Sequence, residues 1–262
     1  MIDLIVVLQL FLVGIFFLDY FGKSAKLSIY ISFIFALVIF FQVTEVFWLV
    51  SVKRVAFNTN ISLQMLSLFI MLTAHYFKTR FKMRTLVLIL LPLSLIFHLL
   101  SHLGFYQNKI LMPVVLSSYV LYLHIIFLIL AYLFFTVSAV VATIYLIQYY
   151  KLKKKKDMEF NLFRMPSLGS LSNLSHVSTK WGFLFLTFGL VLGSYWQKHI
   201  TGVFLQKDLK IIVTIFIWLM FILYFHYKIN YSGHVKRRLV IIILAYIIMI
   251  GSYLLINHNW GV

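Results

Sequence analysis

The chain carries a succession of apolar runs, several of which reach about 18 residues, enough for a helix to cross the ~30 Å hydrocarbon core of a bilayer. Of its 262 residues, 63% are hydrophobic and 11% are charged, which excludes a soluble domain of this length. A membrane β-barrel would instead show alternating segments of about ten residues. The sequence therefore predicts an all-α, polytopic membrane protein with about eight transmembrane helices, near residues 2–20, 27–50, 61–77, 85–106, 117–149, 181–197, 211–227 and 239–257.

Lysine and arginine are unevenly distributed over the predicted loops. The loops that follow odd-numbered helices hold 17 of the 23 Lys and Arg residues. Because these residues concentrate in cytoplasmic loops, the pattern predicts that both termini lie outside, that loop 151–180 is cytoplasmic and that loop 198–210 is external. We expect a multi-pass protein of the bacterial cytoplasmic membrane, with the lipid bilayer as its first partner. A nucleic-acid partner is not expected despite the net charge of +17, because the chain lacks a basic soluble surface.

The longest predicted loop, 151–180, begins with the basic run KLKKKK, which suits anionic lipid headgroups. Leu168, Leu171, Leu174 and Val177 then recur every three residues, and Ser167 is placed to cap a helix. One interpretation is a short amphipathic helix on the inner membrane surface. The other is an irregular linker.

The histidines fall into two groups by predicted depth. The inner group is His75 and His226, and the outer group is His98, His102, His124, His199 and His258. Two histidines that face each other across a helix bundle can ligate haem iron or another metal, although a buried histidine can also simply hydrogen-bond a neighbouring carbonyl. Glu45 is the most isolated intramembrane acid, and we expect it to pair with a lysine or histidine rather than to serve a proton path. The chain has no cysteine and no catalytic motif, so we do not expect an enzyme.

Four segments of the second half occur in a recognisable order: LHIIFLILAYLFFTVSAVVATIYLIQ (123–148), PSLGSLSNLSH (166–176), GFLFLTFGLVLGSYW (182–196) and IWLMFILYFHYK (217–228). They resemble the cytochrome c assembly (CcsA-like) family of haem-handling membrane proteins, and within it the HemX branch. The resemblance covers roughly residues 121–257. We therefore divide the chain into an amino-terminal four-helix membrane region, 1–110, and a cytochrome c assembly-like region, 111–262.

The resemblance implies a set of haem ligands. His124 matches the family's external ligand at the outer start of a helix, and His226 matches a histidine associated with a haem site within the membrane. His258 is a substitute for the second external ligand, and depth alone suggests His75 as the partner of His226. These four histidines are the candidate ligands of the iron.

The external loop of the family carries a tryptophan-rich haem platform of the form WGxxWxWDPKE. The aligned residues here are TGVFLQKDLKI, in which Gly202, Asp208 and Lys210 match. Thr201, Leu205 and Lys207 replace the tryptophans, so much of the stacking surface is absent. Lys207 and Asp208 remain candidate haem contacts, and Lys198, Lys207 and Lys210 can pair with propionates or be solvated.

The resemblance leads to a main hypothesis and several alternatives. The main hypothesis is a non-enzymatic HemX-type protein that binds or senses haem and lowers the level of glutamyl-tRNA reductase, a cytoplasmic partner that it would contact through loop 151–180. The first alternative is a component that delivers haem during cytochrome c assembly, which the missing tryptophans disfavour. The others are a transporter of a small solute and a purely structural subunit.

Overall fold

A computed structural model describes residues 2–22, 27–52, 59–102, 119–154, 166–204, 209–230 and 235–255. Helices account for almost all of these residues, and the described ranges contain no strand. The helices are α1 (Ile2–Phe21), α2 (Leu27–Phe47), α3 (Thr59–Tyr76), α4 (Arg84–His102), α5 (Tyr119–Lys153), α6 (Leu168–Thr201), α7 (Leu209–Asn230) and α8 (Val235–Leu255). Two of them, α2 and α3, continue into short π-helical segments, η1 (Trp48–Val52) and η2 (Phe77–Phe81).

All eight α-helices are long and apolar enough to cross a membrane. The predicted fold class, an all-α polytopic membrane protein with about eight transmembrane helices, is therefore confirmed. The unusual length predicted for the fifth helix is also present, since α5 has 35 residues. The orientation of the termini stays a prediction.

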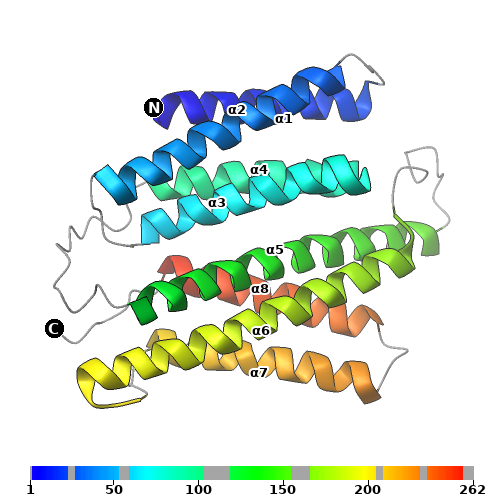
Figure 1. The fold of residues 1–262 in the computed structure, drawn as a ribbon. Helices are drawn as coiled ribbons and strands as arrows, with labels where there is room; N and C mark the ends of the chain where they lie inside the picture. The colour runs from blue at the N-terminus through cyan, green and yellow to red at the C-terminus, as the bar shows by residue number, and fades with distance from the viewer. Residues whose placement is uncertain are drawn as a thin grey trace. The chain divides into compact units, whose positions relative to one another are not determined.

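The chain divides into two compact units. Unit 1 comprises residues 1–114 and 161–165, and contains α1 to α4. In it, α1 packs on α2 and α4, and α3 packs on α2 and α4 (Figure 1). An ion pair between Asp19 and Arg84 joins the end of α1 to the start of α4, beside a 3.1 Å hydrogen bond between the hydroxyls of Tyr20 and Thr85.

Polar side chains link the helices inside unit 1. Ser67 Oγ donates to the carbonyl oxygen of Ser94 at 2.8 Å, and Ser94 Oγ donates to the carbonyl oxygen of Ser67 at 3.0 Å. The amide of Gln42 donates to Ser67 Oγ at 3.1 Å. These groups lie within apolar spans, where a polar group without a partner is costly, so the bonds tie α2, α3 and α4 together.

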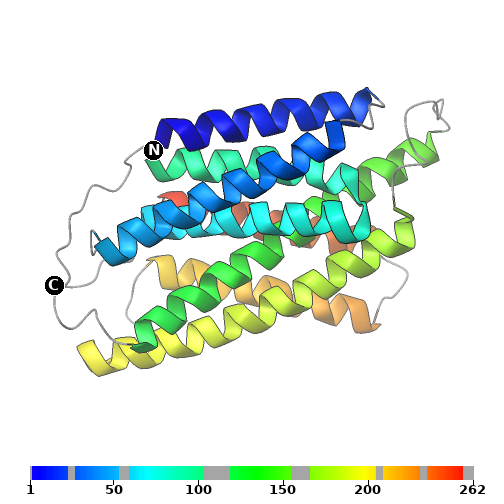
Figure 2. The ribbon, with the colours of Figure 1, turned by 45° about the horizontal axis from the view of Figure 1, so that its top comes forward.

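Unit 2 comprises residues 115–160 and 166–262, and contains α5 to α8. Its longest helices, α5 and α6, lie side by side over much of their length (Figures 1 and 2). The ring of Phe135 on α5 stacks on that of Phe221 on α7, with centroids 4.0 Å apart and planes 6° from parallel. Around this pair the buried core gathers residues of α5, α6, α7 and α8: Ala131, Leu186, Ile217, Ala245 and Met249.

The start of α6 differs from the sequence prediction. Residues 168–180 were assigned to loop 151–180, as a short surface helix or a linker, and a separate helix was expected from residue 181. They instead form the first turns of one continuous helix, whose N-cap is Ser167 as expected, with its side chain accepting a hydrogen bond from the backbone N–H of Ser170. Ser175 and Thr179 of this segment are buried against Ser138 of α5, so packing extends the helix. The rest of that loop, 155–165, lies outside the described residues.

Candidate functional site

His124, the predicted external ligand, projects from the first turns of α5 toward α6. Its Nδ1 lies 2.6 Å from the carbonyl oxygen of Gly189. A carbonyl oxygen can only accept a hydrogen bond, so Nδ1 carries the proton. In the neutral ring, Nε2 then keeps its lone pair, and this is the tautomer that binds a metal through Nε2.

Two glycines of α6 let α5 approach closely, and one of them, Gly193, creates the space for the His124 ring. A Cβ atom built on Gly193 would lie 2.6 Å from Cε1 of His124, and one on Gly189 would lie 2.7 Å from Cδ2 of Leu128. Both distances are far below a van der Waals contact, so neither position accepts a larger side chain without movement of α5 residues. Gly189 and Gly193 form a GxxxG pattern, which lets another helix approach closely, and α5 does so at this point.

Positive charge lies near the same end of unit 2. Lys210, in the first turn of α7, interacts electrostatically with the His124 ring, and its Nζ lies 5.5 Å from the ring centroid of Tyr253. Lys198 extends over the ring of Phe204, with its Nζ 4.0 Å from the centroid. His199, on the last turns of α6, is exposed. Ammonium groups around an oriented imidazole suit a ligand that has both a metal and carboxylates.

These features meet the needs of a haem ligand on one side of the iron. A backbone carbonyl fixes the orientation of the imidazole, the neutral ring would keep a lone pair on Nε2, and an ammonium group is available to an anionic propionate. Three other predicted site residues, His258, Lys207 and Asp208, lie outside the described residues. The second external ligand therefore stays a prediction.

The predicted inner pair, His75 and His226, is divided between the two units. His75 is half-buried on α3 of unit 1, with its ring centroid 5.2 Å from that of Phe35, and its Nδ1 has no hydrogen-bond partner among the described residues. His226 is exposed on α7 of unit 2. Their pairing stays a prediction.

One histidine that was not among the predicted ligands also lies in a polar environment. His176, assigned to loop 151–180, lies on α6, with its Nδ1 3.0 Å from the hydroxyl of Tyr224. It lines a cavity of about 330 Å³ together with Tyr145, Arg238 and residues of the first turns of α6 and α8. The leucine periodicity from Leu168 and the cap at Ser167 were the signals of a helix here, but neither indicated which helices it would contact.

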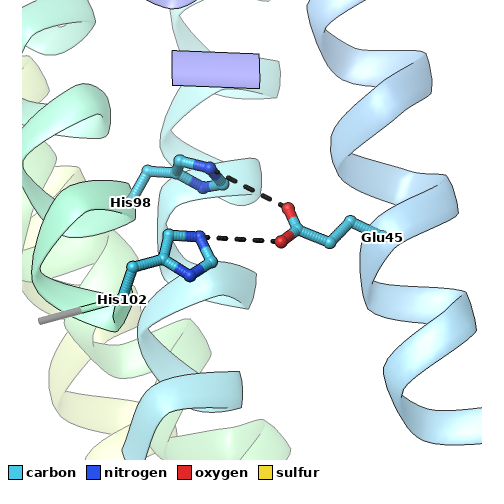
Figure 3. A group of neighbouring side chains, drawn as sticks. All are labelled: Glu45, His98 and His102. Atoms are coloured by element: carbon cyan, nitrogen blue, oxygen red, sulfur yellow. Dashed lines mark ion pairs between the residues drawn. The ribbon is translucent and has the colours of Figure 1, made fainter. Parts of the chain in front are cut away.

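Glu45 pairs with histidine, as the sequence analysis expected. Its carboxylate faces the rings of both His98 and His102 (Figure 3), with Oε2 3.8 Å from Nε2 of His98 and Oε1 3.6 Å from Nε2 of His102. All three side chains belong to unit 1. The contact involves only α2 and α4. It therefore does not test the prediction that His98 and His102 lie at the same depth as His124.

Comparison with known proteins extends the resemblance along the chain. The family model described as "Cytochrome C assembly protein" matches residues 4–259, including the amino-terminal half, which lies outside the resemblance described above. "Cytochrome c biogenesis protein CcsA" of Guillardia theta is 26% identical over 228 residues, which cover 78% of this chain and 75% of the relative.

Two other relatives with the same name match over a shorter part. Those of Pyropia yezoensis and Porphyra purpurea are 29% and 30% identical over 115 residues, which cover 42% of this chain and 36% of each relative. The match thus spans little more than a third of the length of these two proteins. No solved structure matches the chain. Because the family model covers nearly the whole sequence, the chain belongs to the cytochrome c assembly protein family.

Proposed function

We propose that this membrane protein binds haem through His124 and hands it on during cytochrome c assembly. The observation that carries the proposal is the hydrogen bond from His124 Nδ1 to the Gly189 carbonyl, which leaves Nε2 as the metal-binding atom. Membership of the cytochrome c assembly protein family supports the same role. Haem is the cargo in this proposal, and the protein is a carrier rather than an enzyme.

Each residue around His124 has a part in this role. The Gly189 carbonyl fixes the ring plane and the tautomer, and Gly193 leaves room for the ring between α5 and α6. The bound iron would supply the Lewis-acid centre that the imidazole ligates. The Lys210 ammonium, which interacts with the ring, would attract a propionate. A single oriented histidine with a nearby lysine suits a cargo that must later leave.

Regulation of haem synthesis, the main hypothesis of the sequence analysis, gains less support. The relatives named above are all cytochrome c biogenesis proteins, and none is named for glutamyl-tRNA reductase or for HemX. The comparisons therefore favour the haem-delivery alternative, even though the tryptophans of the external loop are replaced. Control of glutamyl-tRNA reductase through loop 151–180 stays a prediction, and these relatives lend no support to a solute transporter.

The first test is an optical spectrum of the full-length protein purified in detergent from cells supplied with haem. We expect a Soret band in the wild type and its loss, or a large decrease with a shifted maximum, in His124→Ala. His199→Ala is the matched control, because His199 is an exposed histidine of α6, and it should retain the wild-type spectrum. A wild type without bound haem, or a His124→Ala spectrum identical to the wild type, would contradict the proposal.

The second test separates delivery from regulation in the source organism. Deletion of the gene should deplete the c-type cytochromes seen by haem staining, and His124→Ala should fail to restore them. Intact c-type cytochromes together with a raised level of glutamyl-tRNA reductase would instead favour the regulatory alternative.

A further inference from the structure

The cluster of Glu45, His98 and His102 belongs to unit 1, whereas His124 belongs to unit 2, and the cluster has no part in the role proposed above. Glu45 comes from the last turns of α2, and both histidines come from the end of α4 (Figure 3). One ligand atom from each of the three side chains lies within 4.8 Å of the others. His98 and His102 are four residues apart, so they project from the same face of the helix.

Within this cluster, the buried ring of His98 lacks hydrogen bonds to the described residues. His98 is 1% exposed, and neither of its ring nitrogens has a hydrogen-bond partner among the described residues. Glu45 is 5% exposed. A buried polar group without a hydrogen-bond partner destabilises the fold, so the position of an imidazole here needs a reason.

The contact with Glu45 does not supply that reason by itself. The two oxygen–nitrogen distances, 3.8 Å and 3.6 Å, are too long for hydrogen bonds. The two imidazoles contact each other edge to face, with ring centroids 4.9 Å apart, and both face the carboxylate without a hydrogen bond to it. A cation among the three ligand atoms would lie within reach of all of them and would give a ring nitrogen of His98 the partner that it lacks among the described residues.

We propose that Glu45, His98 and His102 form a binding site for a divalent transition-metal ion of the zinc or ferrous type. Two imidazoles and one carboxylate are the ligands that such ions bind, with a further position left for water or another ligand. Hard ions such as Ca²⁺ and Mg²⁺ prefer a shell made of oxygens. The donor set therefore selects the chemical class of the ion.

Gln64 of α3 provides the outer support that such sites require. Its Nε2 donates to Glu45 Oε1 at 3.3 Å, and its side chain is buried. A hydrogen bond of this kind fixes the orientation of a ligating carboxylate. The site is thus built from α2 and α4 and supported by α3, all of which are part of unit 1.

The site lies near the ends of α2 and α4, and thus close to one surface of the membrane. Glu45 lies close to the end of α2, just before the η1 segment, and His102 is the last residue of α4. The charge distribution of the loops predicts that these helix ends face outward. We therefore expect the ion to be taken from the external side of the membrane.

Zinc binding to the full-length protein in detergent tests the proposal directly. After chelator treatment and addition of Zn²⁺, elemental analysis should find about one zinc per chain for the single site. His98→Leu, which replaces the ring with an apolar side chain, and Glu45→Gln should weaken binding about 100-fold or more. Gln64→Leu should weaken it about 10-fold, because changes around a metal's ligands cost roughly 10–100-fold in affinity.

His199→Ala is the control, since it removes an exposed histidine of unit 2 and should leave zinc binding unchanged. Addition of Co²⁺ to the wild type provides a readout that does not depend on any variant, because its visible d–d bands report nitrogen and oxygen ligation. Zinc retained equally by wild type, His98→Leu and Glu45→Gln would overturn the site, as would a wild type that binds neither ion.

Haem measured on the same samples keeps this test separate from the proposed function. A protein that binds zinc at Glu45 but no haem overturns only the role of His124, and one that binds haem but no zinc overturns only the metal site.

Discussion

At the scale of single residues, the position of the candidate haem ligand His124 depends on glycines, which have no side chain. Gly193 has no Cβ, and the His124 ring occupies the space where that atom would be. The carbonyl oxygen of Gly189, one turn earlier on α6, accepts the hydrogen bond from the Nδ1–H of His124. The position and the tautomer of the imidazole are therefore set by two glycines on the neighbouring helix.

Substitution of Gly193 by alanine should displace the ring. The new Cβ would lie 2.6 Å from Cε1 of His124, so the ring would have to swing away from the Gly189 carbonyl. We expect haem affinity to fall by roughly 10-fold, as for other changes around a metal ligand, measured as Soret absorbance in a haem titration. Helix stability should not fall, because alanine favours a helix over glycine by about 1 kcal/mol.

Gly251→Ala is the matched control for this prediction. Gly251 also lies within a helix, α8, but a Cβ built on it meets no atom within 4 Å. It should bind haem as the wild type does. Equal haem titrations for Gly193→Ala and the wild type would mean that the ring position is not what the ligand requires.

At the scale of helices, each unit contains a reciprocal pair of serines. Ser67 and Ser94 exchange hydroxyl-to-carbonyl hydrogen bonds between α3 and α4. Ser138 and Ser175 do the same between α5 and α6, at 2.9 Å and 3.2 Å. Small hydroxylated residues let helix backbones approach closely inside a membrane while their polar groups stay satisfied.

The pair between α5 and α6 should contribute measurably to stability. In a double-mutant cycle of Ser138→Ala and Ser175→Ala, we expect a coupling free energy of about 0.6 kcal/mol, and no more than about 1.7 kcal/mol. The free energy of unfolding would be measured by circular dichroism during denaturation with SDS in mixed micelles.

A suitable reference for this cycle is Thr143→Ala. The hydroxyl of Thr143 donates to the carbonyl oxygen of Ala139 within α5 itself, so its loss should not couple to Ser175. Additive effects of Ser138→Ala and Ser175→Ala on the free energy of unfolding would show that the reciprocal hydrogen bonds between the two serines contribute no coupling.

At the scale of the whole molecule, the sidedness of the eight helices rests on the loop charges. The natural chain has no cysteine, so a single introduced cysteine reports its own side of the membrane. Val203, 52% exposed just after α6, is predicted to face outside, and the exposed Arg80 of η2 is predicted to face the cytoplasm.

We expect Val203→Cys to react with a membrane-impermeant maleimide in intact cells and Arg80→Cys to react only after the cells are opened. The opposite pattern would place the His124 end of unit 2 on the cytoplasmic side, and haem would then have to be bound from that face. Labelling of both positions in intact cells would contradict the predicted number of crossings between them.

Most of the helix boundaries could be predicted because the length of an apolar run must match the bilayer, whatever the helix contacts. The exception is α6, whose first turns were assigned to a loop. The leucine periodicity from Leu168 to Val177 describes an amphipathic helix equally well on a membrane surface or against another helix. Only the burial of Ser175 and Thr179 against α5 distinguishes the two.

Local hydrophobicity and charge alone predicted the class of protein and the number of spans, both of which the structure confirms. The residues of the haem site were implied by the family resemblance and stay a prediction. The sequence predicted that Glu45 would pair with a lysine or histidine, but it did not identify His98 and His102 as the partners. Likewise it named His124 as a ligand without the Gly189 carbonyl that orients it. Such contacts join residues far apart in the chain, and the rotation and depth at which helices pack decide them.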